Sequence, residues 1–113
     1  MKKILLDGDF NFTNQQRGRL EAVGQVERLG EVKSDEEWLS AVKGYDVICT
    51  WGDHVVPNLN KLENVLVTYP YTELGSFNSD ELAKKNVYIA NAQGGNRKSI
   101  VEWTVFMVLS LYR

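Results

Sequence analysis

The chain has little cysteine, little net charge and only short apolar runs, and each shortage excludes a class of protein. Cys49 is the one cysteine among 113 residues, so no disulfide forms within the chain. It lies in the apolar stretch DVICTW, where we expect a small buried residue in a reducing compartment. A reactive thiol is the alternative, although neither a histidine nor a cationic residue stands beside it.

The charge and hydropathy patterns argue against nucleic acid and membrane partners. A net charge of −2 gives no basic field for nucleic acid or an anionic bilayer. The segment IVEWTVFMVLSLY is shorter than the ~20 apolar residues of a membrane span, and it contains Glu102. The first apolar run, ILL, is shorter than the ~7–15 residues at the centre of a signal peptide. We therefore expect a cytoplasmic protein.

Apolar runs alternate with helix-like segments along the chain, which is long enough for one domain with a core. Strands are predicted over 2–6, 25–29, 46–51, 65–69 and 87–90, and helical segments over 14–23, 34–42, 57–62 and 78–85. The clearest helix start is SDEEWLSAV, because Ser34 and Glu37 have the spacing of a capping box. Strand 46–51 is apolar throughout, as expected for a strand buried on both faces.

Five strands separated by helical segments predict an α/β fold with a parallel sheet. Right-handed strand–helix–strand units favour a flavodoxin-like three-layer sandwich, with a five-stranded parallel sheet in the order 2-1-3-4-5. Ligands of such sheets bind beyond the carboxyl ends of the strands. The loops of interest are therefore 7–13, 52–56, 70–77 and 92–99.

The last predicted helix is apolar on every side. Ser99 and Glu102 again have capping-box spacing, which predicts a helix that starts near Ser99. Its large apolar residues are Ile100, Val101, Trp103, Val105, Phe106, Met107, Val108, Leu109, Leu111 and Tyr112. A helix lying on one sheet needs an apolar stripe only about 100° wide. We expect one side to pack on its own sheet and the other on a second domain or subunit; a helix central to this domain is the alternative.

The second half of the chain resembles a known enzyme family. VYIANAQGGNRKSIVEWTVFMVLSLYR, with KLENVLVTYPYTELGSFNSDELAKK before it, is similar to the NAD-dependent D-2-hydroxyacid dehydrogenases. Shared features are a strand ending in Asn91, the GGN loop at 94–96, the SIVE helix start at 99–102 and an apolar helix ending in Arg113. The resemblance covers essentially the whole chain, and it is strongest from about residue 62 onward.

The resemblance implies how the chain is divided. Residues 1–98 would form the flavodoxin-like substrate-binding domain, and residues 99–113 the helix that joins it to a Rossmann cofactor domain and contributes to a homodimer. The intact enzyme would transfer hydride between NAD(H) and a small 2-hydroxy or 2-keto acid. The family's GxGxxG motif and its catalytic Arg, Glu and His lie downstream, so we expect no catalytic residue here and no NAD binding by this chain alone.

The same resemblance marks candidate binding residues. Thr72 and Glu73 occupy the loop that faces substrate and, for Thr72, the cofactor; Tyr71 and Glu73 replace glycines of the family pattern. Asn96 matches a position that hydrogen-bonds substrate, and Thr104 one that contacts cofactor. Without ligands, Thr72 would be an ordinary capping residue, Asn96 a turn or N-cap residue, and Thr104 a residue on a helix face.

The loop after the third strand supplies two more candidates. Asp53 and His54, the only histidine, fall where the family's substrate cleft is bordered, although a solvated loop histidine is the alternative for His54. Asp7 and Asp9 suggest a metal or a phospho-receiver site, but TWG and NAQGG replace the receiver's Asp and Lys. We expect no metal site. The rival function is a free-standing flavodoxin-like binding or dimerisation module without catalysis, which would use the last helix for assembly.

Overall fold

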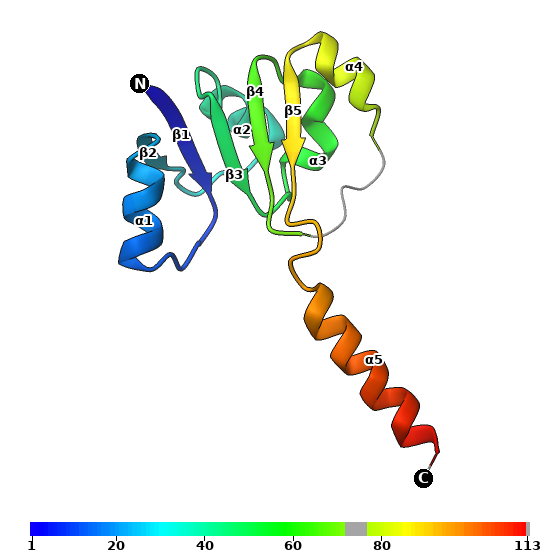
Figure 1. Ribbon diagram of the computed structural model, residues 1–113. Helices are drawn as coiled ribbons and strands as arrows, with labels where there is room; N and C mark the ends of the chain where they lie inside the picture. The colour runs from blue at the N-terminus through cyan, green and yellow to red at the C-terminus, as the bar shows by residue number, and fades with distance from the viewer. Residues whose placement is uncertain (72–76, 113) are drawn as a thin grey trace.

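The computed structural model describes residues 1–71 and 77–112 as an α/β domain with a parallel sheet. In chain order its elements are β1 (Lys2–Asp7), α1 (Asn14–Glu21), β2 (Gly24–Arg28), α2 (Asp35–Ala41), β3 (Val47–Thr50), α3 (Val55–Asn58), η1 (Leu59–Lys61), β4 (Val65–Thr68), α4 (Ser79–Lys84), β5 (Val87–Ala90) and α5 (Arg97–Leu111). The five strands are parallel and lie in the order β2-β1-β3-β4-β5 (Figure 1). The flavodoxin-like topology expected from the sequence is confirmed.

Short polar side chains cap the starts of α1, α2 and α4. The Ser34 side chain accepts a hydrogen bond from the Glu37 backbone N–H at 3.2 Å, as its spacing predicts. The Glu37 carboxylate accepts from the Lys33 N–H at 3.1 Å, so the reciprocal bond is made one residue earlier than in a standard capping box. A complete capping box instead starts α1, between Thr13 and Gln16.

The predicted start of the last helix is wrong by two residues. Helix α5 begins at Arg97, with Asn96 at the N-cap position, and Ser99 lies inside the first turn. The reason is the preceding turn, in which the Gly95 N–H donates to the Ala92 carbonyl at 2.9 Å and the Arg97 N–H to the Gly94 carbonyl at 3.1 Å. These bonds bring the backbone into helical geometry before Ser99 is reached.

One face of the sheet carries the hydrophobic core. Leu5, Ile48 and Val67 are each at most 1% exposed and pack beneath α2, α3, η1 and α4. Trp38 of α2 is fully buried in the same cluster. Its position follows from the apolar stripe of α2, which faces the sheet while its acidic first turn meets solvent.

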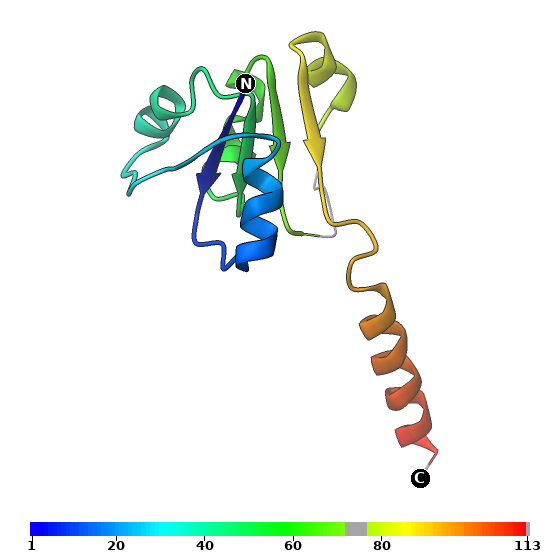
Figure 2. The same ribbon diagram turned by 60° about the vertical axis from the view of Figure 1, so that its left-hand side comes forward.

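The other face of the sheet is only half covered. Helix α1 lies over β1 and β2, where Leu20 faces Leu6 and Val26 across a hollow of about 90 Å³, and Figure 2 shows α1 in front of the sheet. Over β4 and β5 the cover stops, since Leu66 remains 37% and Tyr88 54% exposed.

The half-covered face corrects two expectations for β3. The strand was expected to be buried on both faces, and Cys49 was expected to be a buried residue. Ile48 and Thr50 are buried on the core side, but Val47 and Cys49 are only half-buried on the other. The physical reason is that no helix within residues 1–71 and 77–112 covers this side of β3.

Helix α5 projects away from the domain. Both views show it leaving the carboxyl edge of the sheet without turning back (Figures 1 and 2). Its large apolar side chains are between 41% exposed, at Met107, and 82% exposed, at Leu111. The projection gives a radius of gyration of 17.2 Å, against about 13 Å for a compact chain of this length. The expectations that α5 packs on its own sheet or lies at the domain centre are therefore wrong.

A pair of asparagines joins the starts of β4 and β5. Asn64 and Asn86 both adopt positive φ, at 52° and 59°, a conformation that asparagine tolerates better than most residues. The Asn86 side-chain amide donates to the Asn64 side-chain oxygen at 3.1 Å. Two backbone bonds, from Asn64 N–H to the Lys85 carbonyl and from Val65 N–H to the Asn86 carbonyl, complete the junction.

Within residues 1–71 and 77–112, no helix combines the length and apolar character needed to cross a bilayer.

Asp7 connects three elements of the domain at the carboxyl end of β1. Its Oδ2 accepts hydrogen bonds from the Trp38 indole N–H of α2 and from the Thr50 hydroxyl of β3, each at 2.9 Å. Both donors are at most 1% exposed. A donor that loses its acceptor in such a place loses its solvation without compensation.

Removing the Asp7 carboxylate is expected to destabilise the domain. Asp7→Ala should lower the free energy of unfolding by about 2–6 kcal/mol, because two buried donors lose their acceptor at about 1–3 kcal/mol each. Asp9→Ala is the matched control, since this side chain is 88% exposed and pairs only with Arg28, and an exposed pair contributes about 0–1 kcal/mol. Urea unfolding followed by circular dichroism measures both; equal losses would contradict the role of Asp7.

Candidate functional site

A hollow of about 310 Å³ opens at the carboxyl edge of the sheet. It is lined by segments that follow three strands: 7–9 after β1, 29–32 after β2, and 50–54 after β3. The sequence predicted the first and third of these segments as ligand loops, but not the second. The signal for it was available, because the order 2-1-3 places the loop after β2 at the same edge.

The charged side chains that line the hollow are acidic, apart from His54. Asp7, Asp9, Glu31 and Asp53 all contribute to its wall. The nearby Arg28 pairs with Asp9. Among the described residues that line it, the hollow itself therefore offers an anion little positive charge, and the carboxylate of a hydroxy acid would need a cation from outside this lining.

His54 is held by its neighbours rather than free in solvent. Its Nδ1 lies 2.9 Å from Asp35 Oδ1, and its carbonyl accepts a hydrogen bond from the Asn58 side chain at 2.8 Å. Its ring stacks on that of Trp38 with 6.3 Å between centroids, and its side chain is 29% exposed. The alternative of a solvated loop histidine is therefore wrong; His54 is an anchored wall residue.

The hydrogen bond with His54 is the main cause that holds the pKa of Asp35 below its usual value, and a hydrogen bond with Asn58 is the second. Burial has a smaller effect in the opposite direction. Asp35 lies in the first turn of α2, 19 residues before His54. The pair therefore connects the start of α2 to the loop after β3 beside the hollow.

Asp7 and Asp9 do not act together. The Asp7 carboxylate is engaged by Trp38 and Thr50, whereas Asp9 reaches outward to Arg28. Over residues 1–71 and 77–112, no three side chains of the metal-ligating types gather closely enough to hold an ion.

A row of aromatic rings runs along the same edge. Phe12 stacks on Phe10 at 5.4 Å, Phe10 on Trp51 at 5.2 Å, and Trp51 meets Tyr71 edge-on at 6.2 Å between ring centroids. The row joins the segments after β1, β3 and β4. We did not predict this row from the sequence. The sign that could have indicated it is an aromatic residue within a few positions of the end of β1, β3 and β4.

Gly8 makes this row possible. Its φ of +135° is unfavourable for a residue with a side chain, and a Cβ there would lie 2.3 Å from Cδ1 of Trp51. The indole therefore rests directly on the Gly8 backbone.

The predicted binding residues are only partly brought together. Asp53 and His54 share the 310 Å³ hollow. Thr72 and Glu73 lie outside the described residues. Asn96 and Thr104 belong to the start and body of α5, away from the lining of that hollow.

Asn96 and Thr104 differ in how their side chains are used. The Asn96 side chain makes no capping bond to α5, and the residue is exposed. The Thr104 hydroxyl donates to the Ile100 carbonyl at 2.8 Å, one turn earlier in the helix.

Cys49 shows no sign of an activated thiol. Burial raises the pKa of its thiol, and a hydrogen bond with Thr68 offsets only part of that effect. Because the thiolate is the reactive form, this environment argues against the reactive-thiol alternative.

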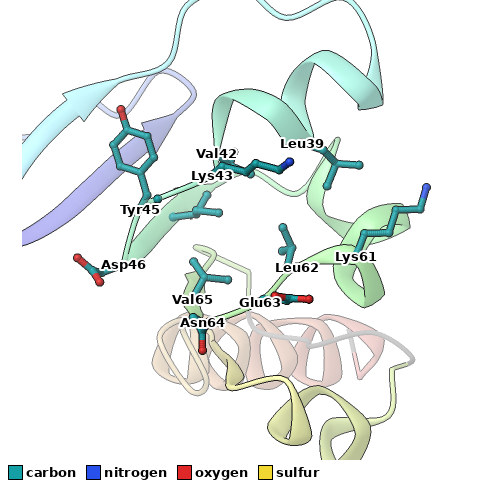
Figure 3. A pocket seen from close by; sticks show the side chains of 12 residues that line it. Leu39, Val42, Lys43, Tyr45, Asp46, Lys61, Leu62, Glu63, Asn64 and Val65 are labelled. Carbon is teal, nitrogen blue, oxygen red and sulfur yellow. The ribbon is translucent and has the colours of Figure 1, made fainter.

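A larger hollow of about 730 Å³ lies at the opposite, amino edge of the sheet. Figure 3 shows the apolar side chains of Leu39, Val42 and Leu62 in its middle, with Lys43 and Lys61 extending from its rim. Its volume exceeds that of the carboxyl-edge hollow. We nevertheless place the candidate site at the carboxyl edge, because parallel sheets bind ligands there and the histidine and aromatic row gather there.

Comparison with known proteins gives no assignment. No protein-family model matches the sequence, and no curated protein matches it significantly.

Replacing Gly8 is expected to disturb the aromatic row. Gly8→Ala should lower the free energy of unfolding by about 3 kcal/mol or more, through an unfavourable φ at about 1–3 kcal/mol and a clash with Trp51. Gly44→Ala is the matched control: Gly44 has φ +86° and open space around it, so only the backbone penalty applies. Unfolding and tryptophan fluorescence measure both. An unchanged emission spectrum in a folded Gly8→Ala variant would contradict the predicted contact.

The Asp35–His54 pair is expected to make stability fall in acid. Because the folded-state pKa of Asp35 is lowered, its contribution is present above its unfolded pKa of 3.8 and is lost as pH falls through the lower folded value. Asp35→Asn should therefore flatten the loss of stability below pH 3.8, measured by urea unfolding across an acid series. Glu36→Gln, in the same helical turn, controls for the helix dipole and should leave the profile as in the wild type.

Proposed function

We propose that this chain is the substrate-binding part of an NAD-dependent 2-hydroxyacid dehydrogenase. In the intact enzyme, hydride would pass between NAD(H) and a small 2-hydroxy or 2-keto acid, with the Rossmann cofactor domain and the catalytic Arg, Glu and His supplied after Arg113. The observation that carries the proposal is α5, whose apolar side chains are exposed on every side. It follows directly on the NAQGGN turn that, with the helix, resembles this family.

The energetics of α5 support a missing partner. Full burial of one large apolar side chain contributes roughly 1.5–3 kcal/mol. Leaving four or five of them in water therefore forgoes on the order of 6–15 kcal/mol, which is comparable to the stability of a whole domain. A cofactor domain on one side of α5 and a second subunit on the other would recover this energy, and both belong to the proposal.

The electrostatics of the carboxyl edge fit a divided site. The hollow there is lined by carboxylates such as Glu31 and Asp53, so we place the cation that pairs with the anionic substrate outside the hollow, on the second domain. Thr72, Glu73 and Asn96 would then form one wall of the substrate site, with Asp53 and His54 at its border. The Asn96 amide can both donate to and accept from a hydroxy acid.

NAD itself does not fit this chain alone. Its pyrophosphate is typically held by a glycine-rich turn at the start of a helix. The GG turn before α5 is not such a fingerprint, and the acidic hollow would repel phosphate. Of the residues present, only Thr72 and Thr104 are proposed to touch the cofactor, and no chemical step is assigned to them.

A second candidate function is a free-standing flavodoxin-like assembly module without catalysis. The exposed apolar surface of α5 favours it equally, since that surface would serve self-association without any cofactor domain. For either function we propose the cytoplasm as the location, because the unpaired Cys49 suits a reducing compartment.

The test of the enzyme proposal is turnover by the polypeptide that the natural reading frame encodes around these residues. We expect that polypeptide to oxidise NADH in the presence of a small 2-keto acid from a panel that includes pyruvate, glyoxylate and hydroxypyruvate. The 113-residue chain alone should show no turnover. A reading frame without a dinucleotide-binding domain, or absence of turnover with every keto acid, would reject the proposal in favour of the module.

Asn96 provides the residue-level test in the active polypeptide. Asn96→Ala should lower kcat/KM by about tenfold or more, because a hydrogen bond to a charged group contributes about 1.5–3 kcal/mol. Gln93→Ala, an exposed residue of the same turn, is the control and should leave kcat/KM nearly unchanged. Equal effects of the two substitutions would remove Asn96 from the site.

A further inference from the structure

The hollow of about 730 Å³ at the amino edge of the sheet has the size of a ligand site. Small-molecule sites in proteins have volumes of roughly 300–1,000 Å³. Helix α2 ends at Ala41 and η1 ends at Lys61, and the hollow lies between these two ends, over the starts of β3 and β4. None of the described residues proposed above for substrate or cofactor lines it.

The floor of this amino-edge hollow is part of the hydrophobic core. Four of its lining residues are at most 5% exposed and belong to the core cluster: Val42, Ile48, Leu62 and Val65. Leu39 of α2 is half-buried beside them, and Figure 3 shows it among the apolar side chains. An apolar group bound here would leave water and extend the packing of the core.

Three polar side chains of the lining are already bonded to other parts of the domain. The Tyr45 hydroxyl donates to a carboxylate of β2, and the Asp46 carboxylate accepts from the Lys3 N–H at 2.8 Å. The Asn64 side-chain oxygen accepts from the asparagine that precedes β5, at 3.1 Å. These bonds hold the rim in place and leave the recognition of a ligand to the other polar groups.

The other polar groups are two lysines and one carboxylate. Lys43 and Lys61 are exposed, and within the part of the chain that the structure describes neither forms an ion pair. Figure 3 shows both on the side of the hollow that α2 and η1 form, whereas Asp46 lies on the side of β1. Glu63 is the remaining carboxylate of the lining. The α2 side of the hollow therefore attracts an anion.

We propose that the amino-edge hollow binds a small organic monocarboxylate with an apolar body, such as a medium-chain or an aryl carboxylic acid. The apolar body lies on the core residues of the floor. The carboxylate meets Lys43 and Lys61, whose ammonium groups donate charge-assisted hydrogen bonds. A monoanion fits better than a phosphate dianion, because Asp46 and Glu63 repel a ligand in proportion to its charge.

The inference does not rest on the dehydrogenase proposal. Helix α5 leaves the carboxyl edge of the sheet and points away from the amino edge, so any chain that follows it starts beyond the opposite end of the domain (Figure 1). The two proposals also fail separately. Turnover of keto acids tests the first, whereas substitution of Lys43 and Lys61 should change ligand binding in the hollow and leave turnover as it is.

The first test is titration with octanoate, followed by calorimetry and by backbone amide shifts in nuclear magnetic resonance spectra. It uses the polypeptide that the natural reading frame encodes, so that a segment filling the hollow would appear as a lack of binding. We expect octanoate to shift the amides of Lys43, Leu62 and their neighbours. Acetate, which lacks the apolar body, and octylammonium, which has the opposite charge, should bind there at least about tenfold more weakly. No octanoate shifts at these residues, or equal binding of octylammonium, would overturn the inference.

The second test changes the charges of the rim. Lys43→Gln/Lys61→Gln should raise the dissociation constant of octanoate about tenfold, because its charged hydrogen bonds are lost. Lys84→Gln/Lys98→Gln is the matched control: it makes the same change in net charge at exposed lysines outside the lining, and binding should stay as in the wild type. Glu63→Gln should tighten binding about two- to threefold, since a repelling charge is removed. Unchanged binding by Lys43→Gln/Lys61→Gln, or weaker binding by Glu63→Gln, would contradict the proposed contacts.

Discussion

The need to cover both faces of a parallel sheet is the constraint on which this structure depends. The central strands carry apolar side chains on both faces, such as Val67 on one side of β4 and Leu66 on the other. Helices α2, α3 and α4 satisfy the constraint on one side, over Leu5, Ile48 and Val67. On the other side α1 reaches only β1 and β2. The exposure of Leu66 and Tyr88 is a consequence of that shortfall.

The same constraint explains which features the sequence could predict. Apolar strands between amphipathic helices have few compatible arrangements, so the strand order followed from the pattern of the elements. Local capping chemistry placed Ser34 correctly because its bond to Glu37 spans a single turn. The start of α5 was misplaced because the turn around Gly94 makes its own backbone bonds and does not use Ser99. The direction of α5 was not predictable, since a helix that is apolar on every side has no preferred face.

The candidate site was predictable as a location but not as a set of contacts. The rule that ligands bind at the carboxyl edge pointed to Asp53 and His54, and the structure places both on one hollow. The partner of His54 is Asp35, on another element, and no local spacing signals such a pair. The aromatic row likewise joins Phe10 to Trp51 across two loops. Contacts of this kind depend on the assembled fold rather than on any short motif.

The asparagine pair at the starts of β4 and β5 has a consequence for the exposed side chains of Leu66 and Tyr88. Side chains alternate along a strand, so a slip of one residue between two strands would turn Leu66 or Tyr88 inward and bring core residues out. The bond between Asn64 and Asn86, with the two backbone bonds beside it, holds β4 against β5 at their first residues and leaves no freedom for that slip. The chain is thus unable to hide these two side chains by re-pairing its strands. Their outward orientation is built into the sheet.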